Sequence, residues 1–339
     1  AQSSQVDTDS TEKFVQTTCP YCGVGCGVSV SVKSGGAIEV HGDRSHPANL
    51  GRLCSKGTAL AETLDLDGRL LYPEVDGERS GWDAALDAVG KRFRDLIDRY
   101  GPDSVAFYVS GQLLTEDYYV ANKLMKGCIG SANIDTNSRL CMSSAVAAYK
   151  RAFGSDTVPN CYDDLEQADL IVLVGSNLAW CHPVLFQRIQ AAKRARPGVK
   201  TIVIDPRRTA SCDGAYLHLA LKSGTDTVLF NGLLHWLHDN GYGDEAFIGR
   251  HTSGVEEALG TARWYAPTPR SVAEQCGLGE DDVEAFFRLF ASDQRAITLF
   301  SQGVNQSSCG TDKGNSIINC HLLTGRIGKP GMGPLSVTG

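Results

Sequence analysis

Four cysteines at a fixed spacing near the start of the chain constrain its fold more than any other feature. Cys19, Cys22 and Cys26 form a C-x2-C-x3-C run, and Cys54 follows within the segment Gly51-Arg-Leu-Cys-Ser-Lys-Gly57. Four soft thiolates in this order are typical ligands of a [4Fe-4S] cluster, with one thiolate on each iron. The spacing therefore predicts a small domain held by its metal, because so short a segment has little core of its own.

Two other uses of these cysteines stay open at this point. A structural zinc site usually takes two paired knuckles, and Cys54 has no near partner. Disulfides across such short loops would be strained. Eight further cysteines show no pairing pattern, and we expect all of them except Cys141 to be reduced thiols that pack as small apolar residues.

Length and charge exclude several classes of protein. The chain has 339 residues, 32 Lys and Arg against 39 Asp and Glu, and a net charge of −7. This length suggests about two domains. The acidic balance offers no general attraction to nucleic acid or to anionic lipid, and no apolar run is long enough to span a membrane. We expect no nucleic-acid partner, no membrane partner and a cytoplasmic location.

A change of pattern along the chain predicts the elements of the fold. Residues 28–33 and 38–41 suggest a hairpin, and Ser80 is a candidate N-cap for an amphipathic helix over residues 82–100. A strand over 104–110 and helices over 116–126 and 143–153 follow. Strands are then expected at 169–174, 200–204, 216–221 and 296–300, among helices at 184–194, 226–238, 245–250, 256–262, 272–276, 281–291 and 313–323. Such alternation indicates an α/β fold with parallel sheets.

Three of these strands end in loops with groups that suit a nucleotide. The loops are Gly175-Ser176-Asn177, Asp205-Pro206-Arg207-Arg208 and Lys222-Ser223-Gly224-Thr225-Asp226. Ligands of open α/β sheets bind beyond the carboxyl ends of the strands, where such loops meet. Gly and Ser amides suit phosphate, carboxylates suit ribose or guanine, and arginines offset charge. Ordinary turns and helix caps would explain the same residues, and no simple NAD(P) or P-loop motif is present.

Three separated motifs in this order carry a family resemblance. Cys19-Pro-Tyr-Cys-Gly-Val-Gly-Cys-Gly27, then Gly51 to Gly57, then Ser138-Arg-Leu-Cys-Met-Ser-Ser144 resemble the molybdopterin oxidoreductases. Within that family the chain is most similar to the catalytic subunits of bacterial assimilatory nitrate reductases. The resemblance implies a small [4Fe-4S] domain followed by Rossmann-like α/β domains with parallel sheets, which hold molybdenum in bis-molybdopterin guanine dinucleotide.

The resemblance also implies a domain division and a set of site residues. We expect a disordered tail over 1–14, the [4Fe-4S] domain over 15–75, an α/β molybdopterin domain over 76–157 with 295–339, and a Rossmann-like nucleotide domain over 158–294. Cys141 would be the protein thiolate on molybdenum. The implied cofactor contacts are Lys56, Gln112, Asn137, Cys141, Val174, Gly175, Ser176, Asn177, Leu178, Ala179, Trp180, Cys181, Ile204, Asp205, Pro206, Arg207, Arg208, Gly224, Thr225, Asp226, Gln302 and Gln306.

The implied activity is the two-electron reduction of nitrate to nitrite in nitrate assimilation. Lys56 would lie between cluster and pterin and help electrons to pass, while Arg139 is a candidate to attract nitrate or to form a structural ion pair. Formate dehydrogenases of the family have His directly after the metal-binding residue, whereas this chain has Met142, which takes no proton. A formate dehydrogenase and a purely electron-transferring iron-sulfur module remain alternatives. Ferredoxin, flavodoxin or an NAD(P)H-dependent reductase subunit would supply the electrons.

Family members are longer than this chain, which stops after the Gly/Pro-rich segment 328–339. We therefore expect an N-terminal portion of such an enzyme, with a fold that is incomplete at its C-terminus.

Overall fold

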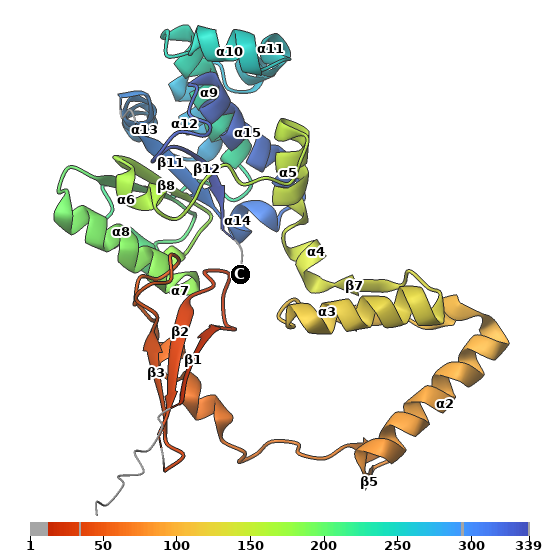
Figure 1. Ribbon diagram of the computed structural model, residues 1–339. Helices are drawn as coiled ribbons and strands as arrows, with labels where there is room; N and C mark the ends of the chain where they lie inside the picture. The colour runs from red at the N-terminus through yellow and green to blue at the C-terminus, as the bar shows by residue number, and fades with distance from the viewer. Residues whose placement is uncertain (1–12, 34, 293–294, 338–339) are drawn as a thin grey trace, which may run out of the picture. The chain divides into compact units, whose positions relative to one another are not determined.

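A parallel sheet of five strands lies at the centre of the larger part of the chain (Figure 1). The computed structural model describes residues 13–33, 35–292 and 295–337. These residues form two compact units, one of residues 1–58 with 141–339 and the other of residues 59–140. The predicted tail over 1–14 lies outside the described residues apart from Lys13 and Phe14, which are not a tail but begin strand β1.

The order of the central sheet is β10-β9-β8-β11-β12, and every neighbouring pair is parallel. The strands are β8 (Leu170–Val174), β9 (Lys200–Ile204), β10 (Leu217–Leu219), β11 (Ala296–Phe300) and β12 (Gly333–Ser336). The chain first adds β9 and β10 on one side of β8 and later returns to add β11 on the other side. The strand order therefore reverses between β8 and β11, which is where open α/β sheets bind their ligands.

Alternating apolar residues let the three middle strands, β9, β8 and β11, contribute to two cores. Leu170, Val172 and Val174 of β8 face one core, whereas Ile171 and Leu173 face the other. The first core contains helices α5 (Ser143–Phe153), α9 (Asp226–Asp239), α11 (Val255–Tyr265), α12 (Pro269–Cys276), α13 (Glu280–Ser292) and α15 (Gly310–Leu323). The second contains α8 (Pro183–Ala195) (Figure 1). The sheet is covered on both faces, as expected for parallel strands that read as continuous apolar runs.

The cysteine-rich start of the chain is a three-stranded antiparallel sheet. Its strands are β1 (Lys13–Thr18), β2 (Gly27–Val32) and β3 (Ile38–Gly42), in that order. The hairpin expected over residues 28–41 is confirmed. A strand was not predicted before Cys19, because residues 13–18 are exposed and carry no buried alternation.

The second unit contains α2 (Trp82–Tyr100), whose bounds match the prediction and which has no buried residue. Its N-cap is Gly81 and not Ser80, because the Ser80 hydroxyl donates to the Gly81 carbonyl and no side chain caps the helix. The unit also contains β4 (Glu74–Val75), β5 (Glu78–Arg79), β6 (Phe107–Val109), β7 (Ile134–Thr136) and α3 (Thr115–Asn122), followed by a π-helical stretch over Lys123–Ile129.

Two further differences concern the end of the chain. Within the Gly/Pro-rich end of the chain, residues 333–336 form β12 along β11, and the Ser336 amide donates to the Tyr149 hydroxyl at 2.8 Å. The expected division grouped residues 295–339 with 76–157, whereas β11 and β12 belong to the same sheet as β8, β9 and β10. Among the described residues, no helix combines the length and the apolar composition that a membrane span requires.

Candidate functional site

The first three expected cluster ligands lie in the loop between β1 and β2. The two strands pair antiparallel up to the residues next to Cys19 and Cys26. The Cys19 amide donates to the Cys26 carbonyl over 2.9 Å, and the Gly25 amide donates to the Cys22 carbonyl over 3.2 Å. This tight loop holds three thiols at one end of the hairpin.

A buried asparagine joins this hairpin to the segment that carries Cys54. Asn49 is fully buried, its Oδ1 accepts from the Gly27 amide at 2.8 Å, and its Nδ2 donates to the carbonyls of Gly27 and Arg52 at 3.0 and 2.8 Å. Cys54 follows at the start of the short helix α1 (Ser55–Thr58). The structure therefore brings together the four cysteines that are 35 residues apart at their extremes.

The four thiols interact electrostatically. Burial raises the pKa of Cys22, and the neighbouring Cys54 and Cys19 raise it further, whereas Lys56 lowers it. Burial, with the same neighbours, raises the pKa of Cys26 to about 12. Four thiolates this close require cations to offset their charges, so the donor set fits a metal group.

The two metal groups open for these cysteines differ in how they use four thiolates. In the described part of the chain, no three His, Cys, Asp or Glu side chains converge on a single ion. A [4Fe-4S] cluster takes one thiolate on each of four irons, whereas a structural zinc ion gathers all four on itself. The number and the spacing of the four thiols suit the cluster that the family resemblance implies. All twelve cysteines are free thiols in this structure.

Helix α8 and the residues before β8 hold the cysteine loops against the sheet. The fully buried Arg188 donates to the carbonyls of Pro47 and Ala48 at 2.7 and 3.1 Å, and it pairs with Asp163 and Glu166. Further hydrogen bonds come from the Tyr162 hydroxyl to the Gly23 carbonyl and from the Gln187 amide to the Leu53 carbonyl. Sequence reasoning missed these three residues, since nothing local marks an arginine as buried.

A second cluster of functional groups surrounds Cys141, just before α5. The Nε2 atoms of Gln302 and Gln306, on and directly after the short helix α14 (Gln302–Asn305), lie 3.1 and 3.4 Å from its sulfur. The Sδ of Met142 lies 3.6 Å from Gln302 Nε2 and 3.9 Å from Asn305 Nδ2. Two amide donors therefore point at the one thiol that the family resemblance assigns to molybdenum.

Helix packing positions Cys141 opposite these glutamines. α5 begins directly after Met142 and packs along α15 and α14. A Cβ on Gly314 of α15 would lie only 2.8 Å from the Cβ of Ala148, so this glycine permits the close approach of the two helices. The Asn315 amide also donates to the Ala148 carbonyl at 3.0 Å.

A cavity of about 580 Å³ opens where the strand order reverses. Nine of the expected contacts line it: Gly175, Asn177, Cys181, Asp205, Pro206, Arg207, Gly224, Asp226 and Gln302. Its volume is within the range of cofactor sites. The three loops that the sequence singled out thus meet, which confirms that they are neighbours in space.

Two glycines form the floor of this cavity after β8 and β11. Gly175 has φ +53°, and the Gly303 amide donates to its carbonyl at 3.0 Å. A Cβ on Gly303 would lie 2.6 Å from the Gly175 Cα, so neither position accommodates a side chain. The two loops therefore cross at close range, and both glycines lie on the lining of the cavity.

Sequence reasoning missed a buried ion pair in the same cavity. Lys313 of α15 lies 2.7 Å from Asp226, with 4% and 10% of the two side chains exposed. Leu221, Ser301, Gly303 and Ser307 also line the cavity and were not predicted, whereas Ser223 lines it from one of the three predicted loops. Ser301 and Gly303 could have been found from their position after β11, whereas no pattern marks Lys313.

Other predicted contacts are not on the cavity surface. Val174, Ile204 and Leu178 are fully buried core residues, and the Ser176 side chain is also buried. The remaining members of the set lie outside the lining, namely Ala179, Trp180, Arg208, Thr225 and Gln306. Lys56 is exposed on α1 near Cys22.

Three predicted residues belong to the other unit. Asn137 Oδ1 accepts from the Gly111 amide at 2.7 Å, next to Gln112. The Arg139 guanidinium pairs with Asp135, four residues earlier. The structure thus gives Arg139 the ion pair that was the alternative to a role with nitrate.

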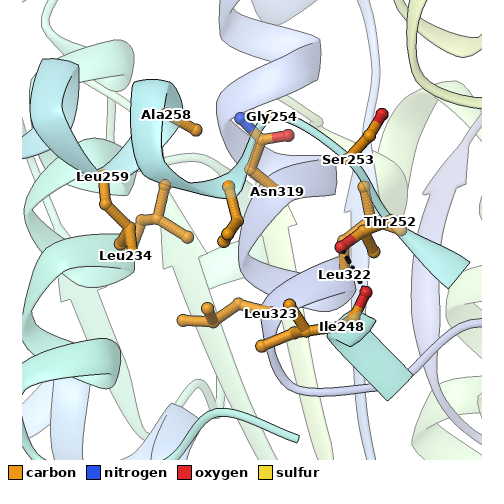
Figure 2. Close-up of a pocket in the computed structure, with 11 residues that line it drawn as sticks. Leu234, Ile248, Thr252, Ser253, Gly254, Ala258, Leu259, Asn319, Leu322 and Leu323 are labelled. Carbon is orange, nitrogen blue, oxygen red and sulfur yellow. Dashed lines mark hydrogen bonds between the residues drawn. The ribbon is translucent and has the colours of Figure 1, made fainter. Parts of the chain in front are cut away.

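A smaller cavity of about 100 Å³ lies apart from both clusters of functional groups. It is enclosed by α9, α10 (Glu245–His251), α11 and α15, and Figure 2 shows Thr252 bonded to the Ile248 carbonyl beside it. Its lining contains no titratable side chain. It offers no chemistry comparable with that around Cys141.

Two family models match most of this chain. A family model described as molybdopterin oxidoreductase Fe4S4 domain matches residues 12–65, and one described as molybdopterin oxidoreductase matches residues 69–338.

The chain is similar to nitrate reductases and, at lower identity, to formate dehydrogenase subunits. A nitrate reductase of Klebsiella oxytoca is 57% identical over 96% of this chain and 37% of its own length. A periplasmic nitrate reductase of Desulfovibrio desulfuricans is 40% identical, over 97% and 45%. The alpha subunit of an F420-dependent formate dehydrogenase of Methanococcus maripaludis is 35% identical, over 94% and 47%. The chain thus spans less than half the length of these relatives.

One solved structure supports the fold. Acetylene hydratase from Pelobacter acetylenicus superposes with a TM-score of 0.78 over 91% of this chain and 43% of that chain, at 24% identity.

Proposed function

This chain belongs to the molybdopterin oxidoreductase family, and on that premise we propose that it takes part in the molybdenum-dependent reduction of nitrate to nitrite. The observation that carries the proposal is the thiol of Cys141, which receives two amide donors beside a cavity at the reversal of strand order. Identity to nitrate reductases of 57% against 35% to a formate dehydrogenase supports nitrate as the substrate.

In this proposal Cys141 is the protein ligand of molybdenum. A thiolate is a soft donor, and the N–H groups of Gln302 and Gln306 stabilise its negative charge. Cys19, Cys22, Cys26 and Cys54 hold the [4Fe-4S] cluster. When bound, the molybdenum cofactor supplies oxygen-atom transfer and the cluster passes electrons singly.

We propose the guanine dinucleotide form of the pterin for the cavity. Gly175, Gly303 and Arg207 line this cavity, where backbone amides would suit a phosphate and the arginine would offset its charge. Asp205 and Asp226 are carboxylates, which accept hydrogen bonds from guanine N–H groups or ribose hydroxyls. The cavity therefore has chemistry for both ends of a nucleotide. We also propose Gln112 and Asn137 as cofactor contacts, on the family resemblance alone.

Two other roles in the proposal concern electrons and the choice of substrate. Lys56 carries its charge near Cys22 and would assist electron passage from the cluster. Met142 replaces the histidine of formate dehydrogenases and holds no proton, so it suits a weakly basic oxyanion better than formate.

We further propose an assimilatory enzyme in the cytoplasm that is supplied by ferredoxin, flavodoxin or an NAD(P)H-dependent reductase subunit. The seven cysteines outside the proposed metal ligands are free thiols in this structure, and cytosolic thiols are kept reduced. Cell fractionation tests this part, and recovery with periplasmic markers would contradict it.

Metal and nucleotide analysis tests the cofactor assignment. Holoenzyme purified anaerobically should contain molybdenum, about four irons per chain and guanine nucleotide that is released on acid treatment. Iron without molybdenum would instead favour an electron-transfer module. One equivalent of zinc without iron would overturn the cluster.

A further inference from the structure

The amide of Gln302 occupies an unusual position for a side chain beside a cavity. Its nitrogen lies 3.1 Å from Cys141 Sγ and 3.6 Å from Met142 Sδ. Its oxygen is buried and has no protein partner. The Met142 thioether can only accept a hydrogen bond, and the same holds for Cys141 when it is a thiolate. The nitrogen of the Gln302 amide must therefore be the end that faces both sulfurs.

We propose that Gln302 is a positioning residue that donates an N–H···S hydrogen bond to the Cys141 thiolate and thereby sets the redox potential of the metal that this thiolate binds. The inference rests on the proposed function, because it requires molybdenum on Cys141. It concerns a residue whose implied role in the family resemblance was limited to contact with the cofactor.

The direction of the effect follows from charge. A hydrogen bond to a metal-bound sulfur withdraws electron density from it, so the metal is reduced more easily and its potential rises. A donor that is partly shielded from water is more effective than an exposed one. Gln302 is half-buried, whereas Gln306 is exposed and its nitrogen is 0.3 Å farther from the sulfur. Gln302 should therefore have the larger effect of the two.

The local fold keeps the Gln302 amide in place. The Ser301 hydroxyl, one residue earlier, donates to the Val337 carbonyl of the segment after β12 at 3.1 Å. The Gly303 amide, one residue later, donates to the Gly175 carbonyl at 3.0 Å. These bonds fix the backbone on both sides of Gln302, from which its side chain reaches Cys141 and Met142.

Two substitutions with side chains of similar size test whether Gln302 acts as a hydrogen-bond donor or only fills space. Gln302→Met keeps the length of the side chain and removes the N–H group, whereas Gln302→Glu replaces the donor by a negative charge. The readout is the potential of the Mo(VI)/Mo(V) couple, measured by redox titration of the Mo(V) EPR signal in the holoenzyme. We expect a lower potential in Gln302→Met than in the unaltered enzyme and a still lower one in Gln302→Glu. In Gln302→Glu the redox equilibrium should shift at least tenfold, which is about 59 mV for one electron.

A matched control carries the same charge without the contact. Ser308 is exposed on the segment after α14, so Ser308→Glu adds a carboxylate that water screens. Its potential should stay near that of the unaltered enzyme. A shift as large as that of Gln302→Glu would mean that any nearby charge acts alike and would overturn the proposal.

The remaining outcomes are also decisive. Unchanged potentials in both Gln302 variants, with full molybdenum content, would overturn the inference and leave the proposed function intact. An unaltered enzyme without molybdenum would contradict the proposed function itself. If the Gln302 variants lose the metal, Gln306→Met provides the same measurement on the exposed donor. Its potential should be lower than that of the unaltered enzyme, with a shift of less than tenfold in the redox equilibrium. An unchanged potential in Gln306→Met would overturn the inference.

Discussion

The Nε2 atom of Gln302 lies 3.1 Å from the sulfur of Cys141, although 161 residues separate them in the chain. The contact exists because Cys141 precedes α5 while Gln302 begins α14 at the end of β11. The tight packing of α5 against α15 at Gly314 fixes the distance between these segments. The candidate metal site is therefore a product of the tertiary fold and not of a local motif.

The crossing of Gly175 and Gly303 should not tolerate a side chain. Gly303→Ala places a Cβ 2.6 Å from the Gly175 Cα, and we expect a loss of about 1–3 kcal/mol in the free energy of unfolding together with reduced cofactor content. Gly198→Ala is the control, because nothing lies within 4 Å of a Cβ there. Denaturant unfolding and molybdenum analysis measure both effects, and equal behaviour of the two variants would contradict this account.

Arg188 should hold the cysteine loops in place. Arg188→Met removes the donors to the Pro47 and Ala48 carbonyls from a fully buried position, so we expect a loss of about 3 kcal/mol in unfolding free energy. Iron content should fall as well, because the loops before Cys54 lose their support. Arg194→Met, an exposed residue of the same helix, should leave stability and iron unchanged.

Stability should fall with acid through His321. Burial lowers the pKa of His321 well below 6.5, and the charge of Arg326 lowers it further, while its Nε2 lies 2.8 Å from the Thr298 hydroxyl. Below pH 6.5 the unfolded chain binds a proton at this site and the folded chain does not. The contribution of His321 to the free energy of unfolding is therefore fully present above pH 6.5. It declines by about 1.4 kcal/mol for each pH unit below 6.5, until the pKa of His321 in the folded protein is reached.

The variant His321→Gln removes this titration. Thermal unfolding between pH 7 and 5 should show a smaller decline for the variant than for the unaltered protein. Parallel declines would contradict the assignment of the acid sensitivity to His321.

Lys56 should affect electron delivery and not metal binding. Its charge lies near Cys22, so Lys56→Met should leave iron and molybdenum content unchanged while turnover with the physiological donor falls about tenfold, or ~1.4 kcal/mol in the barrier. Lys13→Met on the exposed strand β1 is the control. Turnover equal to the control would make Lys56 an ordinary surface lysine.

Elements with a strong local pattern were predictable from the sequence. α2, α5, β9 and β11 have the bounds that the apolar periodicity predicted. The loops after β8, β9 and β10 were also predicted to meet, since carboxyl ends of parallel strands lie at one edge of a sheet. The cavity residues on these three loops were therefore predictable from the sequence.

Features that depend on distant partners were not predictable. Residues 333–336 form β12 because β11 offers an open edge, although glycine and proline occur there. Lys313 and Arg188 are buried because carboxylates far along the chain meet them. A helical lysine or arginine gives no local sign of such a partner, so their roles emerge only from the fold.

Activity of the holoenzyme with two substrates tests the central proposal most directly. Reduced viologen should be oxidised rapidly when nitrate is added, formate should not reduce the oxidised dye, and Cys141→Ala should abolish the nitrate reaction. Formate-dependent dye reduction without nitrate-dependent oxidation would contradict the assignment.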